Sequence, residues 1–256
     1  MRMNLLKVCL GNRVYRLLRP YLRTLNQRRY WHIKQGGKVL LVAHIDTVRK
    51  PRFHGLLHDR IYAAGLDDRL GVCLALDLAQ ERDDVDVLIT DDEEAGQSTA
   101  SLVPFSDLQE YNAVLGLDRG GMDFVDYGLG GKDLVRAYSE YAPHDLGSFS
   151  DICFLDNPPC GCINVGVGYQ DAHDHYSWVR TADIRQTRRN LRAFLEQYSG
   201  TRFPAPAPMD GFWASNGFAV YPQGRTCFYC GVELYQWEPD DCCENCDQCM
   251  QEGLRS

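Results

Sequence analysis

Four apolar runs along the chain read as β-strands, and each of them closes with Asp, Glu or His side chains. In chain order, the runs are Val39–Val48, Val85–Gly96, Ala113–Arg119 and Cys162–His175. Open α/β sheets bind ligands at the edge where the strands have their carboxyl ends. We therefore expect the polar side chains that close these runs to lie together at one edge of a sheet.

The stretches between the runs predict helices and shorter strands. Leu70–Gln80 carries enough apolar residues for a buried helix, and Ala182–Tyr198 has a clear apolar face that ends before Gly200. Weaker patterns predict a short helix with a loop and three short strands, which are Ala100–Glu110, Arg60–Ala64, Phe124–Tyr127 and Leu134–Tyr141. The predicted fold class is α/β, with a mixed, largely parallel sheet between helices in an α/β/α sandwich.

The first residues differ in charge from all the others. The chain has 27 Lys and Arg and 35 Asp and Glu, but residues 1–38 hold ten of the basic side chains and no acidic one. Residues 1–37 read as a basic amphipathic helix interrupted near Pro20. We expect this segment to dock on the acidic body. The alternatives are a targeting peptide and a nucleic-acid patch.

Composition narrows the class of protein. The chain has 256 residues, of which 45% are apolar and 24% charged, as in ordinary soluble globular proteins. No apolar run approaches the roughly 18 residues of a membrane span. The net charge of −8 makes nucleic acid an unlikely main partner. Cysteines scattered in or beside apolar runs fit a reducing compartment, so we expect a cytoplasmic protein with no membrane partner.

The C-terminal tail carries a second motif. Cys227 and Cys230 precede Cys246 and Cys249 in a C-x2-C-x15-C-x2-C pattern, which is typical of a structural zinc site. Cys243 with Cys246 is the alternative second pair. One Zn²⁺ would organise a small zinc ribbon, and a protein partner could bind through this ribbon or through the basic N-terminus.

These patterns divide the chain into four parts. They are a basic helical segment at 1–37, a di-metal hydrolase domain at 38–202, a Pro-rich linker at 203–225 and a zinc ribbon at 226–256. The boundary after the hydrolase domain rests on the stiff stretch Phe203–Met209.

The residues at the predicted strand ends suit a pair of metal ions. Carboxylates with neutral imidazoles form a mixed set of ligands that favours Zn²⁺ and, less well, Mn²⁺ or Co²⁺. Two ions roughly 3.5–4 Å apart need a group that touches both, and a carboxylate with two oxygens does this. Asp67, between a predicted strand and a predicted helix, is our candidate. Glu93 and Glu94 are adjacent and should point in different directions, while Asp46 lies near enough to His44 to orient it.

Five pieces of sequence occur in the order found in a known superfamily. They are AHIDTV (Ala43–Val48), GLDDRLG (Gly65–Gly71), TDDEEAG (Thr90–Gly96), GLDRGG (Gly116–Gly121) and GYQDAHDHYSWV (Gly168–Val179). Over roughly residues 38–200 the chain resembles the di-zinc exopeptidases, which include zinc aminopeptidases, peptidase T and glutamate carboxypeptidase. The spacing leaves no room for the dimerisation domain of the carboxypeptidase branch, so the resemblance is to a compact form.

The resemblance implies a role for each matching residue. His44 and Asp118 would bind one zinc, Glu94 and His173 the other, and Asp67 would bridge the two. The Asp67–Asp68 peptide would be cis, Glu93 would be the general base and acid, and Asp46 would orient His44. Relatives often carry Glu four residues after the last histidine, where this chain has Ser177, so His175 is a rival to His173 as the ligand.

The function implied is that of a zinc-dependent hydrolase. It would cleave a peptide or related amide with a metal-activated water, as an exopeptidase of the aminopeptidase kind. The alternatives are a small-molecule amidase or deacylase, and a non-catalytic binding protein that uses the scaffold and the ribbon.

Overall fold

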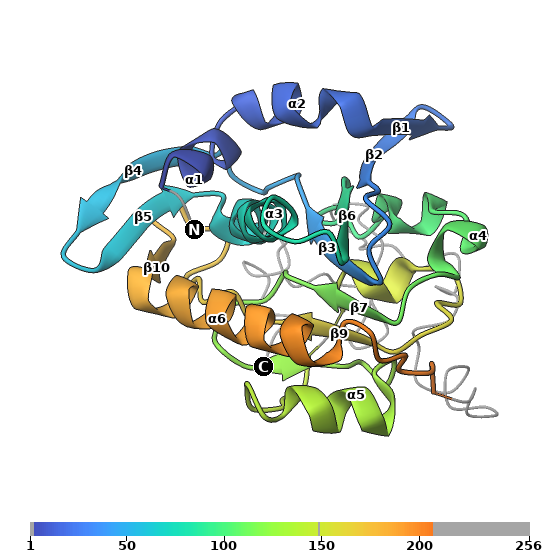
Figure 1. The fold of residues 1–256 in the computed structure, drawn as a ribbon. Helices are drawn as coiled ribbons and strands as arrows, with labels where there is room; N and C mark the ends of the chain where they lie inside the picture. The colour runs from blue at the N-terminus through green and yellow to red at the C-terminus, as the bar shows by residue number, and fades with distance from the viewer. Residues whose placement is uncertain (1–2, 148, 207–256) are drawn as a thin grey trace, which may run out of the picture. The chain divides into compact units, whose positions relative to one another are not determined.

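A seven-stranded mixed sheet forms the centre of the protein in a computed structural model that describes residues 3–147 and 149–206 (Figure 1). Its strands are β1 (Leu22–Leu25), β2 (Arg28–Ile33), β3 (Val39–His44), β6 (Val85–Thr90), β7 (Ala113–Gly116), β8 (Phe124–Val125) and β9 (Cys162–Val165). They are arranged in the order β1-β2-β6-β3-β7-β9-β8. A second sheet has the order β10-β5-β4 and consists of β4 (Arg52–Leu57), β5 (Arg60–Ala64) and β10 (Trp178–Arg180).

Helices and single turns cover both faces of the large sheet. The α-helices are α1 (Met3–Cys9), α2 (Arg13–Leu18), α3 (Leu66–Ala79), α4 (Phe105–Leu108), α5 (Gly131–Tyr138) and α6 (Thr181–Tyr198). The 3₁₀ turns are η1 (Arg19–Tyr21), η2 (Thr99–Leu102) and η3 (Asp151–Phe154). Within the described residues, no helix has both the length and the apolar character needed to cross a membrane.

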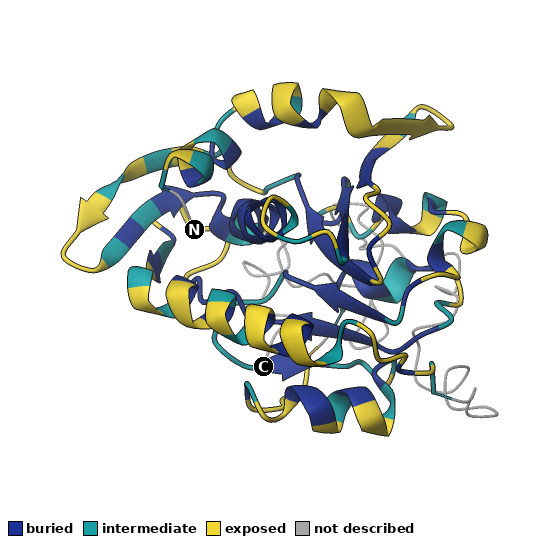
Figure 2. Ribbon diagram, in the orientation of Figure 1, coloured by how far each residue is buried: buried dark blue, intermediate teal, exposed yellow. Residues whose placement is uncertain are grey.

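Alternating strand side chains divide the core into two layers. Val39 and Leu41 of β3 pack with residues of α1, α2, α3, α5 and α6, whereas Leu40 and Val42 pack with η2, α4 and η3. All six residues of β3 and of β6 are buried, as the dark strands of Figure 2 show. The predicted α/β/α sandwich is confirmed, with α1, α2, α3, α5 and α6 in one layer and α4 with the short turns η2 and η3 in the other.

The topology puts β3 at a point where the strand order reverses. β3 is parallel to β6 on one side and to β7 on the other, and β7 is parallel to β9. The chain leaves β3, passes through α3 to β6, and then returns to the other side of β3 as β7. Ligands of open α/β sheets bind at such reversals, beside the carboxyl ends of the strands. The carboxyl end of β3 is His44.

The helical prediction for residues 1–37 is wrong beyond Tyr21. Buried residues of α1 and α2 dock on the body, as expected, but β1 and β2 follow as an antiparallel hairpin at the edge of the sheet. Asn26 and Gln27 form its two-residue turn, both with positive φ, and this backbone matches the twist of hairpin strands. The aromatic and branched residues of β2 then pair with β6.

Two other predictions need correction. The strand expected at Leu134–Tyr141 is wrong, because α5 covers most of this stretch and Leu134, Ala137 and Tyr138 share a buried helical face. The linker does not begin at Phe203, which is only 4% exposed. The Phe203 N–H donates to Asn112 O at 2.9 Å and its carbonyl accepts from the Gly161 N–H at 2.8 Å.

The rest of the predicted linker, from residue 207, and the predicted ribbon at 226–256 lie outside the described residues. The structural zinc ligands Cys227, Cys230, Cys246 and Cys249, with Cys243 as the alternative, therefore stay predictions.

Gly71 allows α3 to cross close to the end of β7. A methyl group there would overlap the carbonyl oxygen of Leu117 and the carboxylate of Asp68. We expect Gly71→Ala to lower the free energy of unfolding by about 3 kcal/mol, as for overpacking of a rigid core. Gly200→Ala is the control, because nothing lies within 4 Å of its added methyl group. Urea unfolding measures both, and equal midpoints for the two variants would contradict the close approach.

Candidate metal centre

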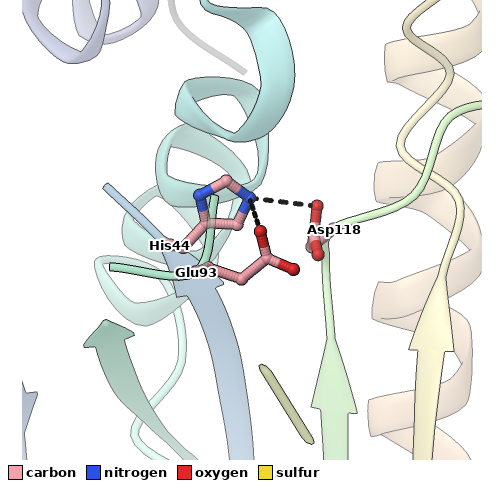
Figure 3. Close-up of side chains that lie close together, drawn as sticks. All are labelled: His44, Glu93 and Asp118. Atoms are coloured by element: carbon pink, nitrogen blue, oxygen red, sulfur yellow. Dashed lines mark ion pairs between the residues drawn. The ribbon is translucent and has the colours of Figure 1, made fainter. Parts of the chain in front are cut away.

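Three neighbouring strands bring His44, Glu93 and Asp118 together. His44 pairs with Thr90 at the end of β6, and Val42 pairs with Gly116 at the end of β7, so the residues that follow come level with His44. The Nε2 atom of His44 lies 3.3 Å from Asp118 Oδ1 and 3.6 Å from Glu93 Oε2 (Figure 3). One atom from each of these three side chains lies within 4.8 Å of the others, which is a spacing that one metal ion can span.

A second imidazole faces the same cluster from a loop. β9 ends at Val165, so His173 lies on the loop that follows it and not on a strand. Its Nε2 atom lies 3.1 Å from Glu94 Oε2 and 3.3 Å from Asp67 Oδ2. The other oxygen of Asp67, Oδ1, lies 3.3 Å from Nε2 of His44. The carboxylate of Asp67 therefore has one oxygen directed at each imidazole.

The backbone around Asp67 sets this direction. The Asp67–Asp68 peptide is cis, as the resemblance implied. Asp67 itself has extended ψ at the start of α3, while Gly65, just before the helix, has positive φ. Asp68 is fully buried, and its Oδ1 accepts a hydrogen bond from the Gly71 N–H at 3.0 Å. The two adjacent carboxylates thus have different surroundings, Asp67 towards the histidines and Asp68 against α3.

Glu93 and Glu94 lie in a tight turn after β6 that directs their side chains to different partners. Asp92 and Gly96 have positive φ, and the Gly96 N–H donates to Glu93 O at 2.8 Å. The Glu94 N–H donates to Asp46 Oδ2 at 3.0 Å. Glu93 consequently points at His44 and Glu94 at His173, which agrees with the expectation that the neighbours face different ways.

Arginines of the N-terminal hairpin brace this turn. Arg29 Nε lies 2.7 Å from Asp91 Oδ2, and Arg28 Nε lies 3.2 Å from Asp92 Oδ2. Part of the basic charge that the sequence places near the N-terminus is thus paired internally with the loop that carries Glu93 and Glu94.

Asp46 holds the other side of His44, and its backbone helps. Nδ1 of His44 donates to the backbone carbonyl of Asp46 at 3.1 Å and lies 3.4 Å from Asp46 Oδ1. A carbonyl oxygen only accepts, so Nδ1 carries a proton and the neutral ring has its lone pair on Nε2. This lone pair faces carboxylate oxygens, an arrangement that repels unless a proton or a cation lies between them.

Several buried polar atoms of the centre lack a hydrogen-bond partner in the described part of the chain. They are His44 Nε2, Asp46 Oδ1, Asp68 Oδ2 and Glu94 Oε1. Buried polar groups are normally satisfied, and buried carboxylates are normally paired or bound to metal. The orphaned atoms His44 Nε2 and Glu94 Oε1 belong to side chains spaced as metal ligands, and they fit divalent cations with mixed nitrogen and oxygen ligands.

Crowding of the acids shifts their proton affinities. Burial raises the pKa of Glu93 to about 9 and that of Asp118 to about 7, and nearby carboxylates add to both shifts. Hydrogen bonds to Asp67 and Glu94 raise the pKa of His173 to about 10. Burial opposes charge on His44, but Asp118, Asp46 and Asp67 together raise its pKa well above the usual value. Without a metal ion, the cluster therefore holds protons at neutral pH.

His175 takes no part in this cluster. Its carbonyl accepts a hydrogen bond from His54 Nε2 at 2.8 Å, and its side chain lines a separate cavity. Ser177, which stands where relatives often carry Glu, closes the loop instead. Its hydroxyl lies 2.6 Å from Asp171 O and 3.0 Å from Asp174 O. The geometry thus brings His173 to the acids.

The sequence patterns missed two residues that hold the centre in place. Asn164 of β9 accepts from the Asp118 N–H at 3.0 Å and donates to Asp118 O at 2.8 Å. A polar residue inside the apolar run Cys162–Val165 was the available signal. Asp151 is buried and accepts hydrogen bonds from Thr90 Oγ1, at 2.8 Å, and from Ser98. Nothing in its local sequence distinguishes it from a surface acid.

No protein-family model matches the sequence, and no curated protein matches it either. Solved structures do match. The aminopeptidase PepT from Bacillus cereus ATCC 10987 superposes with a TM-score of 0.59 at 12% identity, over 76% of this chain and 96% of that one. Aminopeptidase APDkam598 from the archaeon Desulfurococcus kamchatkensis gives 0.59 at 14%, over 77% and 94%. A tripeptidase from Staphylococcus aureus gives 0.54 at 11%, over 68% and 85%. The chain has the fold of these aminopeptidases.

Proposed function

We propose that the protein is a zinc-dependent hydrolase of peptides or related amides, and most specifically an exopeptidase that acts like an aminopeptidase. The observation that carries the proposal is the position of Asp67, whose two oxygens face His44 and His173 separately. Such a carboxylate suits a pair of ions, because each oxygen can bind one of them. The shared fold with aminopeptidases and a tripeptidase supports the same class of reaction.

The side chains divide into two sets around Asp67. His44 and Asp118 would hold one zinc, Glu94 and His173 the other, and Mn²⁺ or Co²⁺ would suit the same atoms less well. Asp46 orients His44 through Nδ1, and Asn164 fixes the backbone that carries Asp118. Bound zinc supplies a Lewis acid that polarises a substrate carbonyl and lowers the pKa of water.

Glu93 is the group placed to move protons. It is buried beside the cluster, and its carboxylate lies farther from His44 Nε2, at 3.6 Å, than those of Asp67 and Asp118, both at 3.3 Å. In the proposed reaction, Glu93 takes a proton from the attacking water and gives it to the leaving amine. Because Glu93 also fits a single-ion set with His44 and Asp118, its role is the part of the proposal that most needs a direct test.

The spacing of the tail cysteines supports a separate structural zinc, held by Cys227, Cys230, Cys246 and Cys249 with Cys243 as the alternative. That ion would have no part in the reaction. A cytoplasmic location and a protein partner for the tail or the N-terminal region belong to the same proposal.

Zinc affinity of the centre is expected to rise with pH. Protons occupy His173 and Asp118 below pKa values of about 10 and about 7, and zinc must displace those on its ligands. Affinity should therefore increase by up to about tenfold per pH unit for each proton displaced, between about pH 6 and pH 9. Competition with a chelator at several pH values measures the slope. An affinity that stays flat over this range would contradict the proton-filled cluster.

His173 and His175 should differ sharply in zinc content. Removing an imidazole that binds metal leaves an open position and uncompensated carboxylates. His173→Ala is expected to bind one zinc fewer per chain than the wild type. His175→Ala is the matched control and should keep the wild-type count, whatever the tail contributes. Metal analysis of both purified variants decides the assignment, and the reverse outcome would transfer the ligand role to His175.

Glu93→Gln should separate proton transfer from metal binding. The variant keeps the size of the side chain and should retain the wild-type zinc count, while kcat falls by about 10²–10⁴-fold, as for loss of a general base. Glu94→Gln is the comparison, and it should lose zinc first and activity as a consequence. Steady-state kinetics with metal analysis on both variants is the measurement.

The substrates for these kinetics come from a screen of aminoacyl, N-acyl and dipeptide amides with the zinc-loaded wild type. If none of these substrates is hydrolysed, the hydrolase proposal is overturned and a binding protein is favoured. A Glu93→Gln variant that loses zinc, or that hydrolyses at the wild-type rate, would overturn the role of Glu93.

A further inference from the structure

A second cavity adjoins the metal centre and has a different electrostatic character. It has a volume of about 620 Å³, within the usual range for ligand pockets. Lys50, Arg52, His54 and His175 supply its polar lining. We call this cavity the basic pocket.

The chain connects the basic pocket to the metal centre at several points. His175 is two residues from His173, and Ala64, which lines the pocket, is three residues from Asp67. Arg49, next to Lys50 of the pocket in the sequence, donates from Nε to the carbonyl oxygen of His173 at 3.1 Å. The side chain of His173 is 51% exposed, so the centre can be approached beside this imidazole. These links place the pocket near the His173 side of the centre.

The cations of the pocket have no acidic partner within the described residues. Neither Lys50 nor Arg52 forms an ion pair there, in contrast to Arg28, Arg29 and Arg119, which all do. Two acids of the His173 loop form hydrogen bonds with other groups. Asp171 Oδ2 accepts from Trp178 Nε1 at 2.8 Å, and Asp174 Oδ1 accepts from the Tyr176 N–H at 2.8 Å. The positive charge of the pocket is thus available to a ligand.

Specific contacts hold the residues that line the pocket. Arg52 and His54 of β4 both line the pocket, with a β-bulge between Phe53 and Gly55, while Lys7 sits 5.0 Å from the ring of Phe53. His54 is fixed by its hydrogen bond to His175 O and by the ring of Tyr176, with centroids 5.0 Å apart. The strand therefore supplies its basic side chains to the pocket and contacts α1 through Phe53.

We propose that the basic pocket binds a carboxylate group of the substrate, close to the bond that is cleaved. This inference rests on the proposed function, since it names the kind of peptide that the same site accepts. Lys50 and Arg52 would form charge-assisted hydrogen bonds with the carboxylate, which are stronger than neutral ones. Two sources offer this chemistry, namely the side chain of Asp or Glu and the free C-terminus of a short peptide.

Two pairs of substrates distinguish these sources. Glu-Ala-amide against Gln-Ala-amide tests an acidic side chain, and Ala-Ala against Ala-Ala-amide tests a free terminus. In one of the pairs, the zinc-loaded full chain should favour the carboxylate member by about tenfold or more in kcat/KM, as for one charge-assisted interaction. Lys50→Gln/Arg52→Gln should reduce that ratio to near one by lowering kcat/KM for the carboxylate member.

A matched control removes the same charge elsewhere. Lys132→Gln/Arg136→Gln changes two exposed residues of α5, at the other end of the sheet, and should keep the wild-type ratio (Figure 1). If hydrolysis shows no carboxylate preference, or if the pocket variant keeps that preference, the proposal for the pocket is wrong. The proposed hydrolase function is then unaffected.

Binding of the same compounds, measured by calorimetry, covers the case in which nothing is hydrolysed. The proposed function then fails on its own. A carboxylate preference in affinity that disappears in Lys50→Gln/Arg52→Gln upholds the pocket, and equal affinities for both members of each pair overturn it.

Discussion

Mutual repulsion of buried carboxylates is the constraint on which the rest of this structure depends. Asp67, Asp68, Glu93 and Asp118 lie around His44, and burial makes their charge expensive. Protons relieve the repulsion in part, as the raised pKa values of Glu93 and Asp118 show. Divalent cations would relieve it further, because they also satisfy the lone pair of His44 Nε2. The fold therefore concentrates acids where only a strong positive charge makes them stable.

Holding these acids together requires rigid support on every side. β3 carries His44 at the reversal of the strand order, the Gly71 N–H of α3 donates to Asp68, and Asn164 hydrogen-bonds the backbone of Asp118 on both sides. The turn of Glu93 and Glu94 is braced from the N-terminal hairpin by Arg28 and Arg29. A hairpin at the far edge of the sheet, whose outer strand is wholly exposed, thereby stabilises the catalytic turn that we propose.

The sequence predicts those parts of the arrangement that follow from the spacing of apolar residues and from the position of polar residues at strand ends. An apolar run that ends in His44 and Asp46 is typical of a buried strand that delivers polar side chains to a sheet edge, and five pieces in order predict both the fold and the residues that meet at the candidate centre. The hairpin at Leu22–Ile33 was missed because its leucines also fit a helical stripe, and the signal that decides it is a backbone turn at Asn26 and Gln27. Asp151 could not be found, because its burial depends on contacts with Thr90 and Ser98 that lie more than 50 residues away.

The small sheet β10-β5-β4 connects the metal centre with the outer surface. β10 begins directly after Ser177, which closes the His173 loop, and it pairs with β5, which leads through Ala64 to Asp67. β4 supplies Arg52 and His54 to the lining of the basic pocket, while Phe53 packs near α1. One small sheet therefore fixes the two loops that supply His173 and Asp67 and also the cations of the basic pocket. Lys7 of α1 over the ring of Phe53 thus links the docked N-terminal helix to the strand that carries these cations.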